Sequence, residues 1–265
     1  EIMPSLVGSE MCIRDRDIPF LYRVHENPDP EKMKSLAIFI NNFGFTLRRK
    51  NDEVSPKELQ KLLANIEGSD AEPIISRIAL RSMKQARYDT VCVGHFGLAA
   101  KYYTHFTSPI RRYPDLQIHR IIKENIKKGL SSRRIEHYRA ILDSVALQSS
   151  QMERRAEEAE RETVKYKKCE YMLNHIGEEF DGIISGVTGF GIFVELENTV
   201  EGFIKMADLE GDYFVYNEAG YELVGEITKK KFVLGQKVRV KVYDIDRLAK
   251  RIDFKLVKEK NGRGD

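Results

Sequence analysis

The chain has 265 residues, of which 42% are hydrophobic and 32% are charged, and its formal net charge is +3. A domain takes about 100 to 200 residues, so this length allows one large domain or two ordinary ones. Thirteen Phe and twelve Tyr exclude a disordered polyampholyte, and there is no apolar run of about 18 residues to indicate a membrane span. Cys12, Cys92 and Cys169 form no CxxC pair, which excludes a disulfide framework and a cysteine zinc site and favours a reducing cytoplasm.

The small net charge results from strong local charges that cancel. Residues 111–139 hold nine Lys or Arg against three Asp or Glu, and residues 226–258 hold eleven against four. Residues 178–226 hold twelve acids and one base, Lys205. The two basic stretches are therefore candidates for contact with a polyanion, and ordinary solvated faces are the alternative that the counts leave open.

Up to Gly177 the chain shows helical patterns. Asp29 followed by Pro30 predicts the N-cap and the first residue of a helix, and SPKE at residues 55–58 is a capping-box sequence that predicts a second. A third helix is expected to begin at Asp70. Residues 133–173 contain no Gly or Pro, which predicts either two helices or one long helix.

After Gly177 the pattern changes to short runs of branched and aromatic residues bounded by Gly, Asn and Asp. Strands are expected at residues 180–185, 191–196, 201–205, 237–246 and 251–256. Five strands in about 80 residues suit a small closed barrel of the OB type. The predicted fold class is therefore α+β, with a helical part followed by a five-stranded OB-type barrel.

Two aromatic residues stand out in the predicted barrel. Phe190 and Phe193 are three residues apart, so on a regular strand they would point to opposite faces. A bulge at Gly191 would bring both rings to one surface. Exposed rings beside basic strands can stack on the bases of single-stranded nucleic acid, whereas the alternative is that both rings belong to the core.

A loop rich in hydroxyl groups precedes another predicted helix. Residues 104–115 contain two prolines, the Ser and Thr hydroxyls of Thr104, Thr107 and Ser108, and two adjacent arginines, and Asp115 begins an apolar-striped helix. Backbone N–H groups and guanidinium groups at a helix start make a good phosphate site. The alternative for either Arg111 or Arg112 is a salt bridge to Asp115 or to another carboxylate on the helix.

Three histidines lie around this loop. His95, His105 and His119 are ten and fourteen residues apart, a spacing that matches no local metal-binding motif. Structural or hydrogen-bonding roles are therefore favoured over a metal site.

Several ordered motifs together carry a family resemblance. GIISGVTGFGIFVEL at residues 182–196, VEGFI at 200–204 and RIDFKL at 251–256 resemble an S1 RNA-binding domain. GHFGL at 94–98 and YTHFTSPIRRYPDL at 103–116 resemble the signature of the ribonuclease II/ribonuclease R (RNB) family, which PFLYRVHENP at 19–28 and LRSMKQA at 80–86 also fit. The resemblance suggests the C-terminal part of an RNB catalytic domain at residues 17–173 and an S1 domain at 177–257.

The resemblance implies a processive 3′-to-5′ exoribonuclease of the ribonuclease R type, which hydrolyses single-stranded RNA to nucleoside 5′-monophosphates with Mg²⁺ as cofactor. It assigns Arg111 to the scissile phosphate, where its charge would stabilise in-line attack by water. Lys205 stands where S1 domains commonly have a histidine. The residues expected to bind RNA are Thr107, Ser108, Arg112, Tyr113, His95, Phe190, Phe193, Lys205 and Arg251, and none is expected to bind a metal.

The ends of the chain give further expectations. The family's Mg²⁺-binding aspartates are expected upstream of residue 17, whereas residues 1–16 match nothing expected and are interpreted as a truncation junction or an artefact. Residues 258–265 are a short polar tail. The parent protein is expected to be the exoribonuclease, and the chain as given, a fragment without these aspartates, is expected to be inactive alone. The alternative is a catalytically inactive RNA-binding module that contains an S1 domain. The intact enzyme is expected to be a cytoplasmic monomer without membrane contact. Its expected partner is single-stranded RNA, and whether it also acts on structured RNA or on mRNA and rRNA decay substrates is left open.

Overall fold

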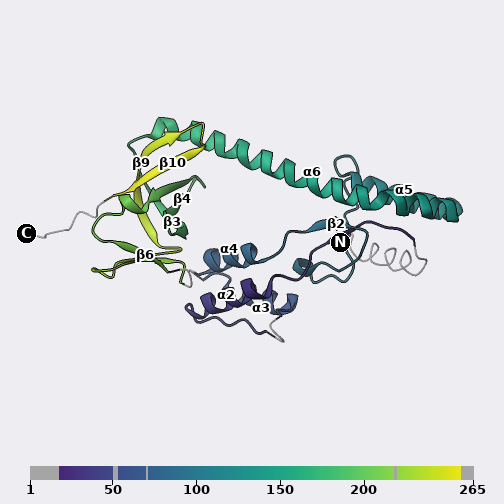
Figure 1. Ribbon diagram of the computed structural model, residues 1–265, viewed down its shortest axis with the longest axis horizontal. Coiled ribbons are helices and arrows are strands. Elements are labelled where there is room, and N and C mark those ends of the chain that lie inside the picture. The colour runs from purple at the N-terminus through teal and green to yellow at the C-terminus, as the bar shows by residue number, and fades with distance from the viewer. Residues whose placement is uncertain (1–17, 50–52, 70, 218–219, 258–265) are drawn as a thin grey trace, which may run out of the picture. The chain divides into compact units, whose positions relative to one another are not determined.

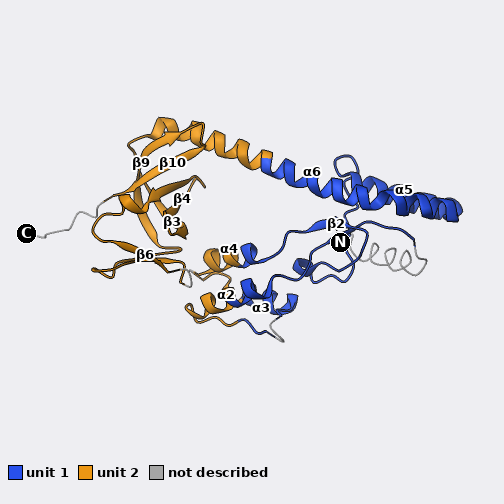
Figure 2. Ribbon diagram, in the orientation of Figure 1, with its two compact units in different colours: residues 1–34, 47–64, 79–158 blue, residues 35–46, 65–78, 159–265 orange. Residues whose placement is uncertain are grey.

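The computed structural model describes residues 18–49, 53–69, 71–217 and 220–257. The expectations for residues 1–16, Asp70 and the tail at 258–265 lie outside the described residues. Two compact units interleave along the chain: unit 1 takes residues 1–34, 47–64 and 79–158, and unit 2 takes residues 35–46, 65–78 and 159–265 (Figure 2). In the described part, no helix is long and apolar enough to cross a membrane.

The α-helices begin where the capping residues predict. Asp29 Oδ1 accepts a hydrogen bond from the Glu31 N–H at 2.9 Å, and Ser55 Oγ accepts one from the Glu58 N–H at 3.3 Å. Both N-cap predictions are thereby confirmed. The helices are α2 (Pro30–Asn41), α3 (Pro56–Ile66), α4 (Glu72–Ser82), α5 (Tyr113–Lys128) and α6 (Ser132–Met172) (Figure 1).

Of the two alternatives for residues 133–173, the single helix is correct. α6 is one continuous helix of 41 residues. The absence of Gly and Pro leaves nothing to break its hydrogen-bond ladder. Short 3₁₀ turns at Phe96–Leu98, Leu173–His175 and Met206–Asp208 complete the described helical structure.

The core of unit 1 joins a short strand pair to two helices. β1 (Tyr22–Val24) pairs antiparallel with β2 (Arg87–Asp89). Ile118 and Ile121 of α5 are fully buried against this region together with Tyr138, Leu142 and Ala146 of α6. The apolar side of α5 is thus fixed, and its opposite side faces solvent.

Unit 2 contains the closed five-stranded barrel that the strand pattern predicts. Its strand order is β10-β5-β4-β3-β9. The strands are β3 (Glu179–Thr188), β4 (Gly191–Leu196), β5 (Glu201–Lys205), β9 (Lys237–Asp246) and β10 (Arg251–Leu256). The predicted α+β fold class, with an OB-type barrel after a helical part, is confirmed.

A small sheet between β5 and β9 is absent from the sequence prediction. It consists of β6 (Phe214–Asn217), β7 (Glu222–Gly225) and β8 (Lys231–Val233). Phe214, Leu223 and Phe232 from this sheet are buried in the same core as the barrel strands. The sheet is therefore an integral part of unit 2.

Gly191 is the tightest point of the barrel. Its φ is +149°, and a Cβ atom at this position would lie 2.1 Å from the Ile204 carbonyl oxygen on β5. The neighbouring Gly189 has no atom within 4 Å of such a Cβ. Of these two glycines, Gly191 is therefore the one required by close approach of the backbone.

Replacing Gly191 by Ala should lower the free energy of unfolding of the barrel by about 3 kcal/mol, because overpacking and backbone strain each cost about 1 to 3 kcal/mol. Gly189→Ala is the matched control and should change it by less than about 0.5 kcal/mol. Calorimetric unfolding of the full chain measures both variants. Equal unfolding temperatures for Gly191→Ala and Gly189→Ala would contradict the close contact of Gly191 with β5.

Candidate nucleic-acid interface

The loop before α5 is tied to its surroundings at several points. Thr104 is buried, and its Oγ1 donates a hydrogen bond to the Leu21 carbonyl oxygen at 2.8 Å. His119 of α5 hydrogen-bonds the Phe106 carbonyl oxygen through Nε2 at 2.8 Å, and the Phe106 and His119 rings stack with centroids 4.1 Å apart. The loop is thus fixed at its start and along the first turns of α5.

Asp115 fixes the rest of the loop from inside the protein. Its side chain is fully buried, and its Oδ2 accepts hydrogen bonds from the Ser108 N–H at 2.8 Å and from Arg112 Nε and Nη2 at 3.1 and 2.9 Å. Among the described residues, its Oδ1 has no partner. A buried carboxylate needs this compensation, so Arg112 and Ser108 are held by Asp115.

The two adjacent arginines consequently have different surroundings. Arg112 is half-buried against Asp115, the salt bridge that the sequence left open for either residue. Arg111 is exposed, and its side chain forms no hydrogen bond or ion pair with the residues that the structure describes. Arg111 is therefore free to bind an external anion, whereas Arg112 shapes the loop.

The other predicted loop residues lie close to these arginines. Thr107 is exposed, and its hydroxyl lies 3.5 Å from Arg112 Nη2. The Ser108 N–H is already donated to Asp115, which leaves its hydroxyl for other contacts. Tyr113 is 49% exposed, and its hydroxyl accepts a hydrogen bond from Gln117 Nε2.

The histidines around the loop are held by internal contacts. His95 Nδ1 accepts a hydrogen bond from the Leu98 N–H at 3.3 Å, and burial lowers the pKa of His95 to about 4, with smaller contributions from His25 and Arg23. Burial, and then Arg112 and Arg23, lowers the pKa of His105 to about 4 as well. Both imidazoles are thus neutral near pH 7 and add no charge to a phosphate site.

A cavity of about 690 Å³ lies beside His95, lined also by Tyr22, His25, Cys92 and Tyr102. In the described part of the chain, no group of three or more His, Cys, Asp or Glu side chains could hold a metal ion.

On the barrel, aromatic rings meet on the outer side of neighbouring strands. Phe193 of β4 registers with Phe203 of β5, and their ring centroids are 4.8 Å apart. Phe203 in turn registers with Asp253 of β10. Phe190 lies in the turn between β3 and β4 and is 83% exposed. We call Phe190, Phe193, Phe203, Lys205 and Arg251 the ring face.

Phe203 is an additional ring that the sequence pattern did not indicate, and the bulge lies at another position than the predicted Gly191. Phe203 is two residues before Lys205, so strand alternation alone would have placed both on one side. The register shift lies on β3 between Ile184 and Gly186, whereas Gly191 pairs regularly with Thr188 and Lys205. Phe190 lies in the turn before β4, outside the strand. Its ring is therefore exposed without a bulge at Gly191.

The two predicted cations of the ring face share one carboxylate. Lys205 Nζ lies 3.5 Å from Asp253 Oδ2, and Arg251 Nε lies 2.9 Å from Asp253 Oδ1. Asp253 is buried, while both cations are about half exposed. One acid against two cations leaves a net positive charge beside the rings, and Asp253 holds the cations in place.

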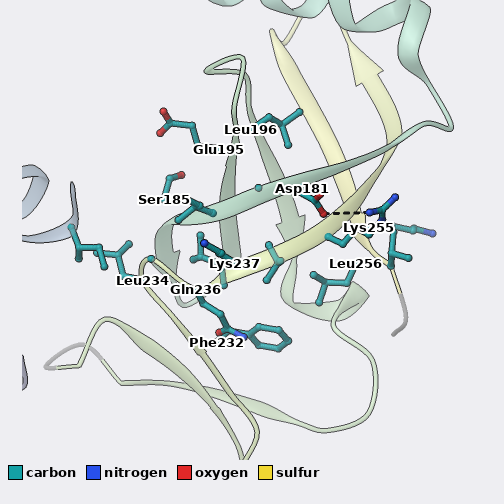
Figure 3. Close-up of a pocket in the computed structure, with 18 of the residues that line it drawn as sticks. Asp181, Ser185, Glu195, Leu196, Phe232, Leu234, Gln236, Lys237, Lys255 and Leu256 are labelled. Atoms are coloured by element: carbon teal, nitrogen blue, oxygen red, sulfur yellow. Dashed lines mark hydrogen bonds and ion pairs between the residues drawn. The ribbon is translucent and has the colours of Figure 1, made fainter. Parts of the chain in front are cut away.

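A larger cleft in unit 2 has different chemistry (Figure 3). It has a volume of about 1310 Å³ and lies between Pro73, Ile74 and Arg77 on one side and the barrel on the other. Arg77 pairs with Glu195 at 2.6 Å, and Asp181 pairs with Arg239 at 3.5 Å. Its five cations face five acids, so this cleft does not favour a polyanion.

The fold is a closed five-stranded barrel of the OB type, joined along the chain to a helical unit in which Arg111 is exposed. Comparison with known families agrees: residues 6–128 match the RNB domain and residues 174–256 match the S1 RNA binding domain. The RNB match includes residues 6–16, within the stretch expected to match nothing. The chain is similar along most of its length to bacterial ribonuclease R.

Individual relatives give the extent of this similarity. Ribonuclease R 1 of Lactococcus lactis is 44% identical over 89% of this chain and 29% of its own length, and ribonuclease R of Aquifex aeolicus is 43% identical over 91% and 34%. The chain thus spans about a third of the length of the curated relatives it matches.

Solved structures extend the comparison. Apo RNase R of Mycoplasma genitalium superposes with a TM-score of 0.87 at 27% identity, over 93% of this chain and 39% of that one. The same protein in complex with ribose-methylated single-stranded RNA gives 0.86, with the same identity and coverage. Yeast Ssd1, a pseudonuclease, shares the fold at a TM-score of 0.58 and 24% identity over 82% of this chain and 27% of its own.

Replacing Asp115 by Asn should destabilise unit 1 by about 3 kcal/mol, because breaking a buried ion pair leaves Arg112 without its counter-charge. The Ser108 amide should also exchange its hydrogen faster, since its acceptor loses its charge. Hydrogen exchange followed by mass spectrometry measures the loop directly. Glu136→Gln, an exposed change on α6, is the control, and an unchanged Ser108 amide in Asp115→Asn would contradict this role.

Proposed function

We propose that this chain acts in a 3′-to-5′ exoribonuclease of the ribonuclease R type that degrades single-stranded RNA processively to nucleoside 5′-monophosphates. The observation that carries the proposal is the free Arg111 at the start of α5, next to an Arg112 that is held by the buried Asp115. Ribonuclease R relatives at 36 to 44% identity support the reaction class.

Arg111 would act on the phosphate at the reacting end of the RNA. Its guanidinium donates charge-assisted hydrogen bonds to the non-bridging oxygens and stabilises the charge that develops during in-line attack by water. Asp115 prevents Arg112 from competing for the same phosphate. It also keeps the loop rigid, so the backbone at Arg111 is already ordered before RNA binds.

Mg²⁺ is the cofactor that the family implies. Magnesium takes oxygen ligands in near-octahedral geometry, usually from one or two carboxylates with water and substrate phosphate. The described residues do not fit such a centre, because no group of three or more potential ligands comes together in them.

The ring face would hold the RNA upstream of the reacting end. Phe190, Phe193 and Phe203 offer planar surfaces for bases, while Lys205 and Arg251 lie beside them for phosphates. Stacking on side chains needs unpaired bases, so this face favours single-stranded RNA. The RNase R complex with single-stranded RNA supports this choice of partner.

An RNA-binding module without catalysis is the second candidate. It is favoured by the lack of a metal-binding group among the described residues. The fold is also shared with a pseudonuclease, so the fold alone does not decide.

Incubating the chain with Mg²⁺ and 3′-end-labelled RNA separates the two candidates. The exoribonuclease predicts release of labelled mononucleotide, which EDTA abolishes. Removal of one transition-state donor costs about 10² to 10³ in rate, so Arg111→Ala should lower release by that factor. Tight RNA binding without any mononucleotide release would overturn the nuclease assignment for this chain and leave the binding module.

Replacing Phe190 or Phe203 by Ala should weaken binding of oligouridylate about tenfold, because one base stacked on a ring contributes about 1 to 3 kcal/mol. Phe193→Ala should weaken it similarly. Fluorescence anisotropy at fixed salt measures the dissociation constant. Tyr171→Ala removes an exposed ring outside the ring face and serves as the control. Unchanged affinity in all three variants would show that these rings only pack the barrel.

A further inference from the structure

The solvent side of α5 carries a regular row of cations. Arg120, Lys123 and Lys127 are all exposed. Their spacing of three and four residues places them on one line along the helix, opposite the fully buried Ile118 and Ile121. We call Arg120, Lys123 and Lys127 the α5 basic face.

The acids of α5 do not neutralise this face. The helix has only two, Asp115 and Glu124. Asp115 is buried with Arg112, as described above. Glu124 is bound by Arg134 of α6, with Oε1 2.7 Å from Nε and Oε2 3.0 Å from Nη2, and by the Tyr138 hydroxyl at 2.9 Å. Both carboxylates are therefore directed away from the three exposed cations.

Cations elsewhere in the described part of the chain are often paired. Lys61 pairs with Glu58 at 2.7 Å, Lys84 with Glu26 at 2.9 Å and Lys167 with Glu170 at 2.6 Å. None of the three cations of the α5 basic face has an ion pair with a described residue. An ordinary solvated face would carry interspersed acids, whereas no described acid pairs with this row.

The α5 basic face also continues from the candidate catalytic loop. Arg111 is exposed two residues before α5 begins, and the half-exposed Tyr113 is the first residue of the helix on the same line as Arg120. From Tyr113 to Lys127 the helix rises about 21 Å. Cations therefore follow one another from Arg111 along the helix, which suits a chain of phosphates.

We propose that the α5 basic face binds the phosphate backbone of RNA, as a second contact beside Arg111 and separate from the ring face. The proposal rests on the proposed function for the identity of the polyanion. RNA is favoured over an acidic protein because a protein interface needs a broad apolar centre, whereas the exposed aliphatic side chain of α5 beside this row is Ile126. The contact does not depend on the base sequence.

The test is the salt dependence of RNA binding by the full chain. Arg120→Gln, Lys123→Gln and Lys127→Gln are combined in one variant, and binding of a long fluorescein-labelled oligouridylate is measured over a KCl series in EDTA, which prevents cleavage. Each phosphate contact in a single strand contributes about 0.7 to the slope of log K against log salt, so the slope should fall by about 2. Affinity at low salt should fall at least about tenfold.

Two further variants distinguish loss of a local RNA contact from loss of net charge and from damage to the fold. Lys61→Gln, Lys84→Gln and Lys167→Gln together remove the same net charge from paired lysines and should leave the slope unchanged. Arg120→Lys, Lys123→Arg and Lys127→Arg together keep the charge and should bind as the parent chain does. Gln and Lys have similar helix propensity, and a thermal melt checks that α5 is intact.

Several outcomes would overturn the proposal. An unchanged slope in the Gln variant of α5, or an equal fall in the paired-lysine control, would show that the face makes no local contact with RNA. If the α5 variant keeps its affinity while Phe190→Ala loses it, the α5 contact is wrong and the proposed function stands. A parent chain that binds no RNA would overturn both.

Discussion

The buried carboxylate of Asp115 is the interaction on which the candidate site depends. A charge in the interior is costly unless donors surround it, and here the Ser108 N–H and two nitrogens of Arg112 supply them through a single oxygen. Satisfying Asp115 therefore uses one of two adjacent arginines. The other, Arg111, is left exposed at the start of α5. Pairing of the buried Asp115 with Arg112 therefore determines that Arg111 is the arginine that faces a ligand.

In the barrel, close packing of the backbone likewise determines which side chains are exposed. The close approach of Gly191 to the Ile204 carbonyl fixes the β3–β4 turn against β5, which leaves Phe190 outside the sheet. The regular β4–β5 register then sets Phe193 beside Phe203. Rings that would be buried in a larger domain are left at the surface because the interior of a five-stranded barrel is already filled by residues such as Ile192 and Val194.

Sequence patterns predicted those elements whose signal is local. Alternation and bounding glycines located the barrel strands within a few residues, and side-chain caps located α2 and α3. The sheet of β6, β7 and β8 was missed because its strands have only three or four residues and owe their order to packing of Phe214, Leu223 and Phe232 on the barrel. Apart from the family resemblance, local pattern could not tell Arg111 from Arg112, since identical side chains differ only through the tertiary contact with Asp115.

The count of charges was equally insufficient to identify a binding surface. In residues 111–139 the excess of cations was visible, but its meaning depends on where the carboxylates point. Asp115 turns inward and Glu124 pairs with Arg134, so the exposed charged side chains of α5 that have no ion pair with a described residue are cations. On the barrel, Asp253 does the reverse, because it stays between Lys205 and Arg251 and reduces their combined charge. A basic surface suited to phosphate is therefore defined by the cations that the fold leaves unpaired.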